Sequence, residues 1–294
     1  WLHDKFTLSS ISSFQYIDDN MTLDQDFLPL EYFTLTQKRK EWALTQDVIV
    51  RGNVGKYGWL GGLFGFYKSS DMSAPVTFKD YGIDQLIEKH RNEANPYYPV
   101  NWNDETFVLG SDFKTPTWGV AIYHQSNYKI GNWDLSAGIR FDYEHVALNY
   151  YSYCNTSYTT YDCTETQELE KVFSCQEVNI DDRGYLDKSF VELLPKVSVT
   201  YNLPMLNMSN VYASVSKGYK AGGYNTQMFS DVLQQRIMKF MGLGMKYDID
   251  DVVGYDPEES INYELGAHLM ANNGHLNADI AMFYIDCQNQ QLTM

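Results

Sequence analysis

Long hydrophobic runs are missing from this chain of 294 residues. The most apolar stretch, Trp59 to Tyr67, is interrupted by glycines and falls far short of the ~20 residues that a membrane-spanning helix needs. The first residues also lack an initiator methionine and the basic and apolar regions of an export signal, so we expect the chain to begin inside a longer protein. No linker rich in proline, serine or glycine divides the chain, which predicts one domain over residues 1–294.

Basic residues are few. The chain has 22 Lys and Arg against 38 Asp and Glu, for a formal net charge of -16. Binding of nucleic acid, or adhesion to anionic lipid through a basic face, needs clustered positive charge. We therefore expect neither of these two modes of binding.

Cysteine and histidine are also scarce, with four and six residues. Cys154, Cys163 and Cys175 lie in one polar segment and Cys287 lies far away, a spacing that matches no zinc motif. Free thiols and one loop disulfide both remain open. The six histidines form no pair at metal-binding spacing, and no catalytic set or cofactor motif is recognisable. We predict no metal, no cofactor and no enzymatic activity.

Aromatic residues, in contrast, are abundant. They make up 15% of the chain, with 24 Tyr, a composition that favours strands and membrane interfaces. In the clearest strand, Trp133 to Glu144, apolar residues alternate strictly with polar ones. Tyr and Trp also gather near expected strand ends, as in the aromatic girdles of a membrane barrel. Alternation alone fits both a soluble sandwich and a barrel whose apolar face meets lipid.

Nine segments have strand character, and their connections alternate in length. The strands are expected at Phe6 to Met21, Glu41 to Arg51, Trp59 to Ser69, Trp118 to Tyr128, Trp133 to Glu144, Lys196 to Tyr201, Val211 to Asn225, Glu258 to Leu269 and Leu276 to Leu292. Short joints lie at Asn53 to Gly58, Gly131 to Asn132, Pro204 to Asn210 and Asn272 to His275. The other connections are long, roughly 15 to 40 residues, which is unusual in compact soluble domains.

Short turns on one rim and long loops on the other are typical of an outer-membrane barrel. The segments Pro75 to Asp112 and Cys154 to Ser189 are therefore expected to be loops outside the cell. Two short amphipathic helices are expected in the long loops, at Ile83 to Asn92 and Asp231 to Met241.

Three motifs follow one another in the C-terminal part. They read V-Y-A-S-V-S-K-G-Y-K-A-G-G-Y-N from Val211, Y-D-P-E-E-S-I-N-Y-E-L-G-A-H from Tyr255, and L-N-A-D-I-A-M-F-Y-I-D-C-Q-N-Q-Q-L from Leu276. Together they resemble the barrel of TonB-dependent receptors. The residues that carry the family pattern are Gly218, Tyr219, Lys220, Gly222, Gly223, Asn225, Pro257, Glu258, Glu264 and Gly266.

The resemblance implies an all-β fold, an antiparallel up-and-down transmembrane β-barrel. About nine strands would be present of the roughly 22 in a complete barrel of this kind, and the plug domain would be absent. It further implies a receptor in the bacterial outer membrane that contacts its lipid, receives energy from the TonB complex through the missing plug, and imports a scarce nutrient. A ferric siderophore is the leading ligand class; vitamin B12, glycans and peptides remain open.

Several side chains are candidates for contacts in such a receptor. Polar residues on the alternating strands are expected to face the lumen and the plug: Arg51, Arg140, Lys196, Glu264 and His268. Leu135, Ile139, Phe141, Tyr263 and Leu265 are expected to face lipid. In the aromatic and proline-rich segment Asn95 to Trp102, we predict that Tyr97, Tyr98 and Trp102 touch the ligand. The alternative is a secreted all-β glycan-binding or glycan-active protein with the same composition.

Overall fold

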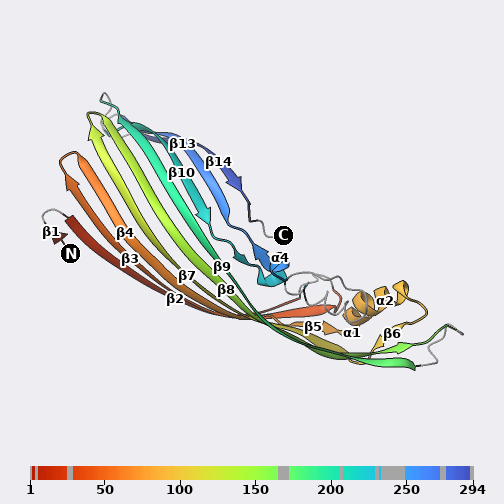
Figure 1. Ribbon diagram of the computed structural model, residues 1–294. Helices are drawn as coiled ribbons and strands as arrows, with labels where there is room; N and C mark the ends of the chain where they lie inside the picture. The colour runs from red at the N-terminus through yellow and green to blue at the C-terminus, as the bar shows by residue number, and fades with distance from the viewer. Residues whose placement is uncertain are drawn as a thin grey trace.

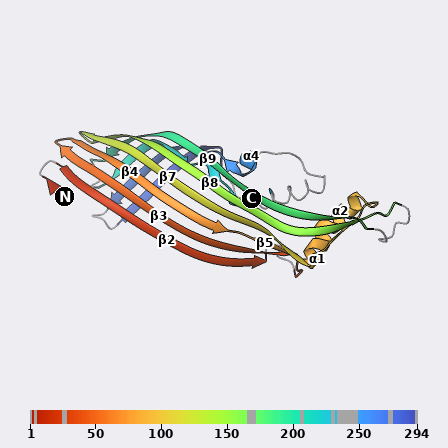
Figure 2. The same cartoon turned by 60° about the horizontal axis from the view of Figure 1, so that its bottom comes forward.

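The computed structural model describes residues 2–3, 6–24, 29–164, 172–204, 208–228, 232, 249–271 and 276–291. One large antiparallel sheet dominates it, curved and twisted along its length (Figures 1 and 2). Its long strands are β2 (Phe6–Asp24), β3 (Phe33–Val54), β4 (Tyr57–Ser73), β7 (Thr106–Ile130), β8 (Trp133–Tyr161), β9 (Val172–Asn202), β10 (Asn210–Lys220), β13 (Glu258–Ala271) and β14 (Leu276–Gln288). The two-residue β1 (Leu2–His3) pairs with β2.

The long strands neighbour one another in chain order, from β2 to β14. This is the predicted up-and-down antiparallel arrangement, and each of the nine expected strands overlaps one of these nine. Among the described residues no pairing joins β14 to β1 or β2, so the described sheet is a curved wall with two edges. Helices are few, and none of those in the described part is long and apolar enough to span a membrane.

Two of the short joints are two-residue turns. Val54 pairs with Tyr57 across one turn, and Ile130 pairs with Trp133 across the other. The first residue of each turn, Gly55 or Gly131, has a φ near +60°, which glycine adopts without a steric penalty. Such tight turns fix the register of the strands on either side. Of the two other short joints, residues 205–207 and 272–275 lie outside the described set.

The connection from β4 to β7 is structured. It contains β5 (Val76–Lys79), α1 (Asp80–Gly82), the π-helix η1 (Ile83–Glu88), α2 (Lys89–Ala94) and β6 (Val100–Trp102). The helix predicted from Ile83 to Asn92 is therefore confirmed, inside a longer helical stretch. These helices lie at the narrow end of the sheet, away from the two-residue turns (Figure 1). The second predicted helix, Asp231 to Met241, lies outside the described residues apart from Val232.

The prediction that Cys154 to Ser189 forms a loop is wrong. β8 continues to Tyr161 and β9 begins at Val172, and the two pair along almost their whole length. The alternating pattern ends near Glu144 because Val146, Ala147 and Leu148 are all buried, so this part of β8 has no exposed face. The segment Pro75 to Asp112 is likewise not a simple loop, since β7 already begins at Thr106.

Two hydrophobic clusters form outside the broad part of the sheet. One joins η1, β6 and the far ends of β7, β8 and β9 around Ile83, Trp102, Phe107, Cys154 and Tyr158. We call the unit that contains it, residues 76–109, 152–161 and 172–182, the appendage. The other cluster packs Phe113 and Leu148 against Tyr224 and Val253. It supports α4 (Ile249–Val253) and the small sheet of β11 (Gly223–Tyr224) and β12 (Gly254–Tyr255).

Candidate functional site

Exposed or partly exposed aromatic side chains form two rows across the outward face of the sheet. Three neighbouring strands carry one at each level, ten positions apart: Tyr57 and Tyr67 on β4, Trp118 and Tyr128 on β7, Trp133 and Tyr143 on β8. At ~3.4 Å per residue and a tilt of about 40°, ten residues rise about 26 Å, close to the ~25 Å apolar band of an outer-membrane barrel. The spacing therefore matches the thickness of the membrane.

The aromatic rows also make contacts across strands. Trp42 stacks on Tyr67 with ring centroids 5.0 Å apart, and Trp133 lies 4.6 Å from Tyr201. Between the rows the face is apolar and open. The residues predicted to face lipid are all exposed there: Leu135, Ile139, Phe141, Tyr263 and Leu265.

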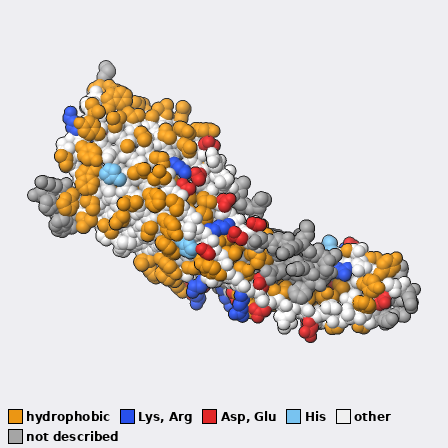
Figure 3. All heavy atoms as spheres, viewed as in Figure 1, with side chains coloured by type: hydrophobic (Ala, Val, Ile, Leu, Met, Phe, Trp, Pro, Cys, Tyr) orange, Lys and Arg blue, Asp and Glu red, His pale blue; other side chains and the backbone are white. Residues whose placement is uncertain are grey.

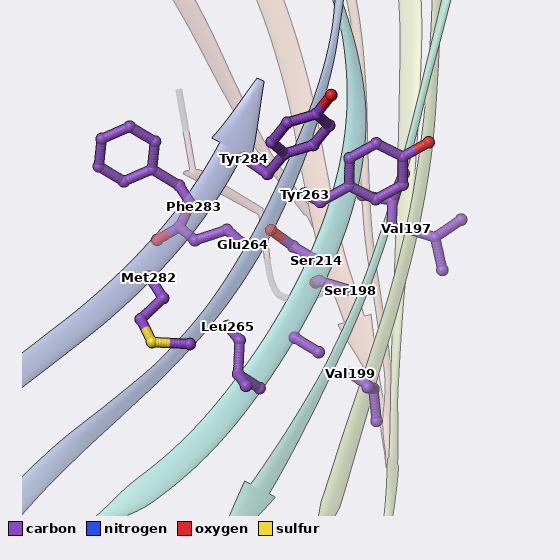
Figure 4. Close-up of a pocket in the computed structure, with 12 residues that line it drawn as sticks. Val197, Ser198, Val199, Ser214, Tyr263, Glu264, Leu265, Met282, Phe283 and Tyr284 are labelled. Carbon is purple, nitrogen blue, oxygen red and sulfur yellow. The ribbon is translucent and has the colours of Figure 1, made fainter. Parts of the chain in front are cut away.

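A shallow groove crosses this apolar face between β9 and β14 (Figure 4). Exposed Val197, Val215, Tyr263 and Met282 line it. Val197, Val215 and Tyr263 follow one another in register across three strands, so they share one face of the sheet. The apolar side chains of the groove suit contact with lipid chains better than contact with a water-soluble ligand.

The opposite, inward face carries the candidate lumen residues. Reading the register across β3, β4, β7, β8 and β9 places Arg51 in one row with Gly138 and Lys196. Arg140 and Glu264 belong to the rows on either side of this one, on the same face, and His268 lies further along the same face, where it pairs with Asn210. The five predicted residues thus share one side of the sheet, although they do not form one compact cluster.

Arg140 is the centre of the first polar group on the inward face. Its guanidinium donates three hydrogen bonds of 2.8 to 3.0 Å to the carboxylate of Asp142. The same guanidinium lies over the rings of Phe64 and Tyr123, at 5.3 and 5.6 Å from their centroids. The Tyr123 hydroxyl donates to Asp47 Oδ1 at 2.7 Å. Four strands, β3, β4, β7 and β8, are joined in this way.

A second polar group joins β10, β13 and β14. The Tyr212 hydroxyl donates to Glu264 Oε1 at 2.6 Å, and its ring stacks on His268 with centroids 5.3 Å apart. His268 Nδ1 lies 2.7 Å from Asp279 Oδ1. Gly266 is required here, because a Cβ on it would lie about 2.5 Å from the ring of Tyr212. The family motif residues Glu264 and Gly266 therefore cooperate in one contact.

A third group of polar side chains was not predicted from the sequence. Lys217 Nζ lies 2.8 Å from Glu192 and 2.6 Å from Glu259, which ties β10 to both neighbouring strands. Glu192 lies outside the strand expected at Lys196 to Tyr201, so the expected strands do not include the alternation of polar and apolar residues around it. Asp47 and Tyr123 were also missed, although both occupy the polar positions of expected strands.

The motif residues after β10 hold the chain where it leaves the main sheet. A Cβ on Gly222 would lie 2.5 Å from the Tyr255 carbonyl oxygen, so only glycine permits this approach. The Asn225 amide donates to the Val253 carbonyl at 2.7 Å. Glu258 accepts a hydrogen bond from the Gln291 amide at 2.8 Å. Their role in the structure is architectural.

The aromatic segment of the appendage divides into buried and exposed parts. Trp102 is only 7% exposed and stacks on Tyr158 at 5.1 Å, while its indole N–H donates to Thr156 at 2.7 Å. Trp102 is thus part of the core, and its burial removes it from the residues predicted to touch the ligand. Tyr97 is 54% exposed, and Tyr98 packs 5.3 Å from Phe173.

Two titratable groups in the appendage are perturbed by burial. Desolvation raises the pKa of Glu88, whose carboxylate accepts a hydrogen bond from the Trp102 amide and lies near Asp84. Burial likewise raises the pKa of the Cys154 thiol to about 12. Cys154 and Cys163 are buried, whereas Cys175 and Cys287 are exposed. Within the described residues no His, Cys, Asp and Glu side chains gather as a metal site.

The sheet is an antiparallel wall with an apolar outward band, two aromatic rows and a polar inward face. These features together are those of the wall of an outer-membrane β-barrel. The chain belongs to the TonB-dependent receptors: the family model described as "TonB dependent receptor-like, beta-barrel" matches residues 1–294. This family consists of transport receptors of the outer membrane of Gram-negative bacteria. No curated protein sequence matches the chain.

Two solved structures share the fold. The ferric yersiniabactin uptake receptor FyuA from Yersinia pestis is 17% identical with a TM-score of 0.63, over 99% of this chain and 35% of the receptor. The siderophore receptor PiuA from Acinetobacter baumannii is 11% identical with a TM-score of 0.55, over 96% of this chain and 38% of the receptor. This chain therefore spans little more than a third of the length of either.

Proposed function

We propose that the receptor containing this chain imports a ferric siderophore across the outer membrane, driven by the TonB complex through a plug domain. The observation that carries the proposal is the match of the whole chain to the receptor-barrel family. Of the solved structures with this fold, FyuA is described as a ferric yersiniabactin uptake receptor and PiuA as a siderophore receptor, which favours that ligand class.

The inward face would contact the plug in this proposal. Charged groups inside a barrel need partners or water, and Arg51 and Lys196 form no ion pair with any described residue, while Arg140, Glu264 and His268 each have one polar partner. We propose that all five meet plug residues of complementary charge.

The ligand would meet the appendage first. Exposed Tyr97 and the neighbouring Tyr98 offer aromatic rings beside prolines that restrict the backbone, a suitable surface for a ring-bearing ligand. A secreted glycan-binding protein is disfavoured, because the apolar band on the outward face far exceeds the patches that soluble monomers expose.

Uptake of radioactive iron by a deletion strain tests the proposal. Loss of uptake from at least one purified ferric siderophore, restored by the full-length gene, is the expected result. Tyr97→Ala together with Tyr98→Ala should reduce uptake, whereas Tyr185→Ala, which removes another exposed tyrosine, should not. If the deletion leaves uptake of every siderophore unchanged and abolishes growth on another nutrient, that nutrient replaces the siderophore as the proposed ligand.

A further inference from the structure

One long strand of the sheet has a neighbour on only one side over about half of its length. β9 pairs with β8 from Val172 to Tyr201, whereas its pairing with β10 begins only at Lys196. Among the described residues, no strand pairs with the other side of β9 between Val172 and Asp187. This part of β9 lies at the margin of the narrow part of the sheet (Figure 2). We call the unpaired side of residues 172–187 the free edge of β9.

The free edge lies outside the lipid-facing band. Val191 pairs with Tyr143 of the aromatic row, and the residues before Val191 lie progressively further from the band. The free edge ends at Lys188, whose Nζ lies 3.2 Å from Asp250 of α4. The neighbouring strand β8, in contrast, pairs with β9 on one side and with β7 or β6 on the other. The backbone N–H and C=O groups of the free edge are therefore open to another extended chain.

The side chains along the free edge are mainly acidic. Charged side chains gather toward the narrow end of the sheet, while hydrophobic ones cover the broad part (Figure 3). Glu177, Asp181 and Asp187 are exposed and share the outward face of β9, since an even number of residues separates them. The one basic residue among them, Arg183, lies 3.3 Å from Asp181 and 4.2 Å from the ring centroid of Tyr151. Glu177 and Asp187 form no ion pair with any other described residue, so both carboxylates are available to a partner.

We propose that the free edge of β9 binds an extended basic segment of a partner protein, which joins the sheet as a further antiparallel strand. Backbone hydrogen bonds hold the segment, and its basic residues lie opposite Glu177 and Asp187. Tyr185, on the same face and 56% exposed, packs against a side chain of the added strand. A second copy of the receptor is disfavoured as the occupant, because it would bring the same acidic row against this one. The proposed site is independent of the imported ligand.

Binding of a synthetic peptide to the full-length receptor in detergent tests this proposal. In the probe, lysine and threonine alternate, and the peptide is long enough to reach from Glu177 to Asp187. We expect it to bind and to slow hydrogen exchange of the amides of residues 172–187, whereas the same peptide with glutamate in place of lysine should not bind. The variant Glu177→Gln/Asp187→Asn should lower the affinity about 10-fold, because two opposite-charge pairs across the strands are lost. The variant Asp24→Asn/Glu93→Gln removes two exposed carboxylates away from β9 and should leave the affinity unchanged.

Methylation of the peptide backbone separates strand pairing from simple attraction of charges. Alternate residues of an extended chain direct their N–H groups to opposite edges. N-methylation of either all lysines or all threonines should therefore abolish binding in one case and preserve it in the other. The same effect of both methylations would overturn the proposal, because the peptide would then not pair along one edge. Absence of binding to the folded receptor, or equal binding of the lysine and glutamate peptides, would overturn it as well.

Discussion

Arg140 and Asp142 lie two residues apart on β8, and their side chains meet on the inward face in a pair with three hydrogen bonds. The guanidinium is 37% exposed and the carboxylate 17%. The pair therefore lies between a surface ion pair and a buried one, and its removal should have a measurable cost.

Asp142→Asn should destabilise the full-length receptor by about 1 to 2 kcal/mol, because a half-buried guanidinium loses its counter-ion. The measurement is denaturant unfolding in detergent or lipid. Asp181→Asn is a matched control, since Arg183 and Asp181 have the same spacing on β9 but are largely exposed. That control should cost much less, because solvent screens the exposed pair. Equal effects of the two variants would contradict the assigned burial.

Ile139→Arg should destabilise the receptor in lipid by about 2 to 4 kcal/mol, because the charge would lie near the middle of the apolar band. Gln125→Arg, at a similar height on the inward face, should cost little. A lipid-soluble probe should label Ile139→Cys and miss Arg140→Cys. The reverse labelling would show that the register of β8 is shifted by one residue.

A membrane-impermeant maleimide added to whole cells should label Cys175 and spare Cys154. The thiolate is the reactive species, and Cys154 is buried with its pKa raised to about 12, so raising the pH from about 7 to about 9 should leave it unlabelled. Peptide mapping by mass spectrometry gives the readout. If Cys175 is labelled only after lysis, this segment lies on the inner side of the outer membrane and the expected topology is inverted.

Trp102→Ala should loosen the appendage, with a local cost of about 3 to 5 kcal/mol for truncating a buried aromatic side chain. Trp102→Phe should cost less, about 1 kcal/mol, since chiefly the hydrogen bond to Thr156 is lost. Hydrogen exchange of appendage peptides measures both. Tyr97→Ala, at an exposed position, should leave exchange unchanged.

Glu88→Gln should stabilise the helical part of the appendage at neutral pH. Because the folded pKa of Glu88 is raised, the folded state holds its proton more tightly than the unfolded state, and stability falls as pH rises through that pKa. Glutamine keeps an acceptor for the Trp102 amide without the charge. Near pH 7, hydrogen exchange of residues 80–94 should be slower in Glu88→Gln than in the unsubstituted protein, by a factor that grows with the pKa shift of Glu88. In acid the two proteins should exchange at the same rate. Identical exchange at both pH values would contradict this.

The sequence predicted the wall better than the parts beyond it. Alternation identified Trp133 to Glu144 because one face meets lipid and the other a polar interior, so the period of two is visible in the residues. At Val146, Ala147 and Leu148 both faces of β8 are covered, so the pattern is interrupted there. The chain between Val211 and Asn225 leaves the main sheet after Lys220, where close approaches at Gly222 and Gly223 decide its course.

The candidate site shows the same division. Arg140 and Glu264 could be placed on the polar side from strand periodicity alone. The burial of Trp102 could not, since its partners Phe107 and Tyr158 meet it only once β6 pairs with β8. Pairs such as Lys217 with Glu192 also depend on which strands are neighbours and how far each extends.

The hairpin of β8 and β9 extends far beyond the part of the sheet that spans the membrane. From Tyr143 to Tyr161 the strand continues for about 60 Å past the aromatic row of Tyr67, Trp118 and Tyr143. On the expected topology, with this segment outside the cell, large molecules approaching the cell would meet this tip before they reach the mouth of the barrel. The tip has its own hydrophobic cluster, separate from the wall, so substitutions on its surface should leave the register of the lipid-spanning strands unchanged.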